Sequence, residues 1–100
     1  MIIELETDFD EKEKKLLGEY NDIDIKLFIE HDRLRLSGIE NGEKYTEILS
    51  KPRRMIGVGG LYLLELCDEP NEWYMGLLGK DSNYSFWGNY GDLEFALKSL

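Results

Sequence analysis

The middle of the chain reads LYLLELC over residues 61–67 and, after the turn DEPN at 68–71, continues as WYMGLLG over 73–79. The first run is apolar at consecutive positions, which is typical of a central strand covered by helix on at least one side. Pro70 and its polar neighbours favour a turn, so the second run predicts another strand of the same sheet. The two runs therefore predict a central strand and a second strand joined by a turn.

Further strands are predicted on both sides of these two. Apolar residues alternate over 23–29, a second run includes Leu34 and Leu36, and a third covers 43–49 after Asn41-Gly42, the strongest short hairpin signal. The pattern predicts three consecutive antiparallel strands there, a first strand within 1–7 and a last one at 84–88. The longest irregular stretch is predicted at residues 51–60. Its glycine-rich part, Gly57-Val58-Gly59-Gly60, is expected to allow a flexible or tight turn of the backbone and not to bind phosphate.

Two amphipathic helices are predicted at the ends of the chain. The first covers 9–20, where Asp8 to Glu11 has the Asp-x-x-Glu form of a capping box, and the second covers 92–100. The sequence therefore predicts one α+β domain, residues 1–100. Its mostly antiparallel, twisted sheet has about six to seven strands and carries both helices on one face.

The charge of the chain is strongly acidic and unevenly distributed. The net charge is −9, with nine acids and three lysines in residues 1–24, and seven acids and two lysines in residues 61–100. Such a field repels phosphate backbones and attracts a basic partner, which disfavours direct nucleic-acid binding. Acidity that serves only solubility is the alternative explanation.

The apolar runs and the cysteine content indicate the compartment. No run approaches the roughly 20 apolar residues that a membrane span requires, and the N-terminus lacks a basic flank followed by an apolar block. We therefore expect a cytoplasmic protein without a membrane partner. Cys67, the single cysteine, has no internal disulfide partner and is expected to pack as a small hydrophobe.

The sequence is poor in histidine and cysteine, which many catalytic and metal-binding sites require. His31 is the only histidine, so no Ser/His/Asp or Cys/His constellation can be built without it, and its 36-residue separation from Cys67 matches no zinc spacing. We therefore expect no enzyme, no metal and no cofactor. A small enzyme with a carboxylate-based site remains an alternative, which two buried Asp or Glu residues in a deep pocket would favour.

Aromatic residues gather beside the acids of the second half. Trp73, Tyr74, Tyr84, Phe86, Trp87 and Tyr90 lie within 18 residues. One face of their hairpin must meet the core, and the other is either covered by a helix or exposed among acids, where it would suit a basic partner. The predicted partner-binding residues are Asp68, Glu69, Glu72, Trp73 and Tyr74 at the first turn, with Asp81 at the second.

The last 15 residues, Phe86 to Leu100, read FWGNYGDLEFALKSL. This segment resembles the tail of small bacterial immunity proteins, in which a Trp-Gly-x-Tyr-Gly-like turn leads into a short Asp-Leu-Glu-x-Ala-Leu helix. Immunity proteins of this kind are partners of polymorphic toxins, including those of contact-dependent growth inhibition systems. The resemblance implies a cytosolic antitoxin that binds a cognate toxin, frequently a basic nuclease, so that substrate is excluded.

A regulatory module that docks on a housekeeping protein is a second binding hypothesis. A gene neighbour that encodes a large secreted protein with a variable C-terminus would favour the toxin. The identity of the toxin, the oligomeric state, and inhibition by occlusion or at a distance stay open at this stage.

Overall fold

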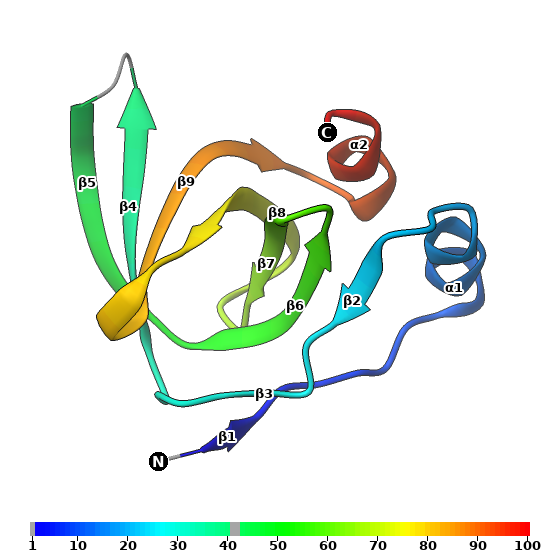
Figure 1. Ribbon diagram of the computed structural model, residues 1–100, viewed down its shortest axis with the longest axis horizontal. Helices are drawn as coiled ribbons and strands as arrows, with labels where there is room; N and C mark the ends of the chain where they lie inside the picture. The colour runs from blue at the N-terminus through cyan, green and yellow to red at the C-terminus, as the bar shows by residue number, and fades with distance from the viewer. Residues whose placement is uncertain (1, 41–42) are drawn as a thin grey trace.

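The computed structural model describes residues 2–40 and 43–100 (Figure 1). Its helices are α1 (Glu11–Gly18) and α2 (Leu93–Lys98), with a short 3-10 helix η1 (Lys80–Ser82). Its strands are β1 (Ile3–Glu4), β2 (Ile23–Ile25), β3 (Phe28–Ile29), β4 (Leu34–Glu40), β5 (Glu43–Ser50), β6 (Pro52–Val58), β7 (Leu61–Leu66), β8 (Glu69–Leu78) and β9 (Asn83–Tyr90). The predicted α+β fold, with a helix near each end of the chain, is confirmed.

The described strands form one large sheet and one small one. The large sheet has seven strands in the order β2-β6-β7-β8-β9-β4-β5, and β1 pairs separately with β3. Neighbours in the large sheet are antiparallel except β4 and β9, which run parallel. The sheet is therefore mostly antiparallel, as predicted, with one parallel pair that the sequence did not indicate.

The predicted meander over residues 23–49 is only partly right. The alternating run at 23–29 is divided into two strands, of which β2 joins β6 in the large sheet and β3 joins β1 in the small one. Because β3 and β4 do not pair, only β4 and β5 form the predicted antiparallel pair. The predicted Asn41-Gly42 turn lies outside the described residues.

The stretch that was predicted to be irregular contains a central strand. Residues 52–58 form β6, which lies between β2 and β7. Pro52 occupies the first position of the strand, where the absence of a backbone N–H is tolerated. Gly59 and Gly60, with φ of 56° and 91°, make the turn into β7, a conformation that L side chains rarely adopt.

The large sheet has a packed cluster on each face, because successive side chains of a strand point to opposite sides. Leu64 belongs to the first cluster, which also contains Leu34 and Leu36 of β4 and Met55 of β6. Three strands separate β4 from β6 in the sheet order, so the sheet must curve to bring these residues together, as Figure 1 shows. Gly76 of β8 lies at a β-bulge, where a side chain would meet the carbonyl oxygen of Ser85.

Both helices cover the opposite face, as predicted. The second cluster contains Leu63 of β7 and the buried residues of the helices, Leu17 of α1 and Leu93, Ala96 and Leu97 of α2. The capping box of α1 is formed by Asp10 and Glu13, two residues later than predicted. Asp92 caps α2 and accepts a hydrogen bond from the backbone N–H of Phe95 at 2.7 Å.

Cys67 does not pack in the core, contrary to expectation. Strand β7 ends at Leu66, so Cys67 lies in the turn that follows, where it is exposed and its Sγ is 3.5 Å from the carbonyl oxygen of Pro52. In the described part of the chain, no helix is long and apolar enough to cross a membrane.

Candidate functional site

The predicted partner-binding acids lie at the two ends of β8. Asp68 is exposed in the turn between β7 and β8, Glu69 is exposed at the first position of β8, and Glu72 is half-buried in the same strand. Asp81 lies in η1, beyond the other end of the strand. The structure therefore brings Asp68, Glu69 and Glu72 together but places Asp81 elsewhere.

The two predicted aromatic anchors belong to the core. Trp73 is fully buried in the cluster beneath the helices, and Tyr74, 8% exposed, lies in the cluster on the opposite face. Of the two alternatives for the hairpin, the covered one is therefore correct: both faces of β8 are packed, and neither Trp73 nor Tyr74 offers an exposed contact. Burial, the hydrogen bond to Glu69 and the negative charges of Glu69 and Glu72 raise the pKa of Tyr74.

Other aromatic side chains are available at the surface. Trp87 of β9 is 44% exposed and Phe95 of α2 is 59% exposed. Phe95 lies between Glu94 and the buried Ala96, and it falls outside the apolar stripe of the helix. Its position outside the apolar stripe is the sequence signal that could have identified Phe95 as a surface residue.

Acids from both ends of the chain line one shallow hollow of about 140 Å³ between the helices and the start of β8. Asp10 and Glu13 come from the start of α1, Asp92 and Glu94 from the start of α2, and Asn71 from the start of β8. We call this site the acidic hollow; its lining residues are Asp10, Lys12, Glu13, Leu16, Asn71, Asp92, Leu93 and Glu94. The sequence could not indicate that the two acidic ends meet, because that depends on how the helices pack.

Local hydrogen bonds orient several of these acids. The Asp10 carboxylate accepts a hydrogen bond from the backbone N–H of Glu13 at 2.7 Å, and the Glu13 carboxylate accepts one from the N–H of Asp10 at 3.0 Å. Lys98 donates to Glu94 at 2.8 Å, and Lys12 lies 3.8 Å from Glu94. The helix caps thus hold carboxylates at the rim of the hollow.

A buried arginine lies behind this surface. The Arg54 guanidinium donates to both carboxylate oxygens of Glu65, to both oxygens of Glu13 and to the carbonyl oxygen of Asp8. These five hydrogen bonds use all five N–H groups that a guanidinium has. Its carbon Cζ lies 4.8 Å from the ring centroid of Phe9 and 5.1 Å from that of Trp73, so two aromatic rings also contact the cation.

Glu65, the partner of Arg54, is fully buried and is itself saturated with donors. Besides Arg54, it accepts hydrogen bonds from Arg53 Nη1 at 3.1 Å and from the backbone N–H of Asn71 at 2.7 Å. Asn71 adopts a left-handed conformation, φ 70°, in the bulged turn. A buried carboxylate without partners would be costly, and these donors compensate its lost hydration.

For both Arg54 and Glu65, hydrogen bonds and nearby charges shift the pKa more than burial does. Burial alone disfavours the charged guanidinium, but hydrogen bonds and charge from Glu65 and Glu13 raise the pKa of Arg54. Burial likewise disfavours the Glu65 carboxylate, but hydrogen bonds from Arg54 and Asn71, with the charges of Arg54 and Arg53, lower its pKa from 4.5. Both groups therefore stay ionised at neutral pH.

The network connects the walls of the acidic hollow. Glu13 is a lining residue that binds Arg54, and Asn71 is a lining residue that binds Glu65. Sequence reasoning missed Arg54 because it lies in the stretch predicted to be irregular. The signal that could have found it was Glu65, the one charged residue in the apolar run LYLLELC, which requires a cationic partner if that run is a central strand.

The arrangement is suited to binding a cationic surface. Among residues 2–40 and 43–100, no group of three or more His, Cys, Asp or Glu side chains is placed to hold a metal ion.

Comparisons of the chain with known protein families, with curated proteins and with solved structures find no match.

The lowered pKa of Glu65 predicts an acid-sensitive fold. Above pH 4.5, Glu65 is ionised in both the folded and the unfolded state. As the pH falls below 4.5, the unfolded state binds the proton before the folded state does, because the folded pKa is lower. The free energy of unfolding therefore decreases with falling pH, and this decrease ends once the pH is below the folded pKa. We expect Glu65→Gln to lower stability at pH 7 and to reduce the slope of stability against pH below 4.5. Urea denaturation between pH 7 and pH 3 measures both; a slope equal to that of the wild type would contradict the assignment.

Proposed function

We propose that this protein is a cytoplasmic immunity protein that binds a cognate basic toxin, a nuclease, and blocks its active site or substrate surface. The observation that carries the proposal is the meeting of both acidic ends of the chain at the acidic hollow. The net charge of −9 and the resemblance of residues 86–100 to the tails of immunity proteins support it. The enzymatic alternative has less support, because the buried Glu65 is fully paired with arginines.

The acidic surface provides a physical route to inhibition. A nuclease must attract the phosphates of its substrate, so its cleft carries basic side chains that a row of carboxylates can occupy instead. Asp68, Glu69 and Glu72 add three acids close in sequence to Asn71, a lining residue of the hollow. The exposed Phe95 beside Glu94 supplies an aromatic contact of the kind that dominates binding energy at interfaces.

Removing the acids of the turn should weaken toxin binding. We expect the triple variant Asp68→Ser, Glu69→Ser, Glu72→Ser to lose about 2–3 kcal/mol of binding free energy toward the product of the adjacent toxin gene. Glu69 accepts a hydrogen bond from Tyr74, so thermal denaturation must accompany the binding measurement.

The matched control removes the same charge from other exposed positions, as Glu19→Ser, Asp22→Ser, Asp32→Ser. Calorimetry should show nearly unchanged affinity for this control. Equal losses in both triple variants would show that net charge alone is responsible, and unchanged affinity in the first would place the interface elsewhere.

Salt should act mainly on the association rate. Exposed charges act over a Debye length of about 8 Å at physiological ionic strength, so screening removes the steering of a basic partner. Between 20 mM and 500 mM salt, we expect the association rate to fall about tenfold or more while dissociation changes much less. Stopped-flow rates that are flat across this range would refute electrostatic mimicry, even if binding itself were confirmed.

A further inference from the structure

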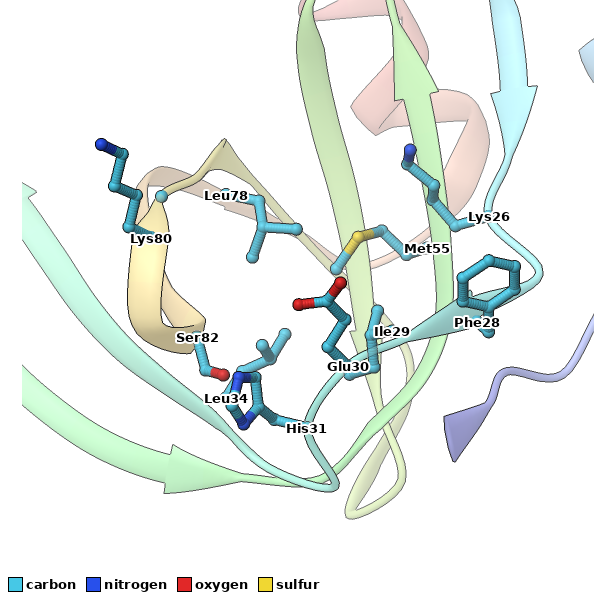
Figure 2. Close-up of a pocket in the computed structure, with 11 residues that line it drawn as sticks. Lys26, Phe28, Ile29, Glu30, His31, Leu34, Met55, Leu78, Lys80 and Ser82 are labelled. Carbon is cyan, nitrogen blue, oxygen red and sulfur yellow. The ribbon is translucent and has the colours of Figure 1, made fainter. Parts of the chain in front are cut away.

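A second concave site lies at the other end of β8 from the acidic hollow. It is a pocket of about 260 Å³ between β3, β4, β6 and the chain around η1 (Figure 2). Its apolar residues include the buried Ile29, Leu34 and Met55 and the half-buried Leu78. The volume is below the roughly 300 Å³ at which small-molecule sites begin, and it suits one inserted side chain.

One carboxylate, that of the exposed Glu30, lines this pocket, whose floor is apolar and whose rim also carries Lys26 and Lys80. In Figure 2 the Glu30 side chain reaches between Leu78 and Met55, while the ammonium groups of Lys26 and Lys80 point away. Lys26 is engaged elsewhere, with its Nζ 3.5 Å from Asp24 and 5.5 Å from the ring centroid of Tyr62. Within the described part of the chain, Glu30 forms no ion pair or side-chain hydrogen bond.

A buried hydroxyl lies in the same wall. Ser82 Oγ is inaccessible to solvent and has no hydrogen-bond partner among the described residues. Ser82 also has a φ of 63°, an uncommon conformation for a residue with a side chain. Buried polar atoms are nearly always paired in native proteins, so this hydroxyl can gain a hydrogen bond if its side chain rotates toward the pocket.

We propose that this pocket receives an arginine side chain of the partner protein. The aliphatic stem would lie on Leu34, Met55 and Leu78, and the guanidinium would bind the Glu30 carboxylate, with the Ser82 hydroxyl as a second acceptor once its side chain rotates toward the pocket. A planar guanidinium forms two parallel hydrogen bonds with a carboxylate, which suits arginine better than lysine. This inference rests on the proposed function, because it names a second contact for the same basic partner.

The surroundings of the pocket fit an anchor residue in a protein interface. Phe28, which lines the pocket, is 54% exposed, and the neighbouring Leu27 is 62% exposed. An apolar rim of this kind excludes water from a central contact and strengthens it.

The test uses a free probe and requires no partner. Nα-acetyl-arginine amide, titrated into ¹⁵N-labelled protein, should give saturable NMR shifts at Glu30, Leu78 and Ser82 with a millimolar dissociation constant. The uncharged isostere Nα-acetyl-citrulline amide should bind at least about tenfold more weakly, because it cannot form the ion pair. Glu30→Gln should remove the difference between the two probes, whereas Asp32→Asn, an exposed acid outside the pocket, should preserve it.

Three results would overturn the proposal: equal binding of both probes to the wild type, arginine-specific binding that survives in Glu30→Gln, or shifts confined to residues 68–72. Spectra of the variants establish that each is folded. The outcome is separable from that of the proposed function. If the toxin-binding experiments fail while the probe binds at Glu30, the arginine-binding pocket stands and the proposed toxin partner does not. If the toxin binds as proposed while the probe does not bind at Glu30, the proposed function stands and the pocket assignment does not.

Discussion

The buried Arg54 guanidinium requires five hydrogen-bond acceptors from the protein, because it is almost entirely shielded from water. The residues that supply these acceptors come from separate parts of the chain. Glu65 of β7 supplies two of them, Glu13 of α1 supplies two, and the backbone at Asp8 supplies the fifth. A guanidinium that lost these partners would retain a charge that burial makes expensive. One side chain therefore ties the N-terminal segment and first helix to the centre of the sheet.

This constraint has consequences at the surface. Two residues of the acidic hollow, Glu13 and Asn71, are held from behind by Arg54 and Glu65, so their positions are set by the core and not by solvent. A binding surface that is ordered before association loses less conformational entropy when the partner arrives. The same logic applies to the helix caps, where Asp10 and Asp92 are fixed by backbone N–H groups. The acidic hollow is thus a preorganised feature.

The sequence predicted what depends on local pattern and missed what depends on long-range pairing. The period-3.6 pattern identified the helices, alternation identified β4, and runs of consecutive apolar residues identified β7 and β8. Strand β6 was missed because Pro52, Arg53 and Arg54 suggest a solvated loop, and only burial against Glu65 and Glu13 makes an arginine acceptable there. Asp68 and Glu69 lie at the surface as predicted, whereas Glu72 is half-buried and Trp73 and Tyr74 are buried, since no local signal shows that both faces of β8 are covered.

A double-mutant cycle between Arg54 and Glu65 tests the central claim most directly. Removing one partner of a buried pair typically costs about 3–5 kcal/mol, whereas replacing both by apolar residues of similar size removes the uncompensated charge. In urea denaturation at pH 7, Arg54→Met and Glu65→Met should each be strongly destabilising. The double variant should be more stable than the sum of the two predicts, by at least about 2 kcal/mol. A coupling free energy below about 0.5 kcal/mol would contradict the account, because Arg54 and Glu65 would then contribute to the fold independently.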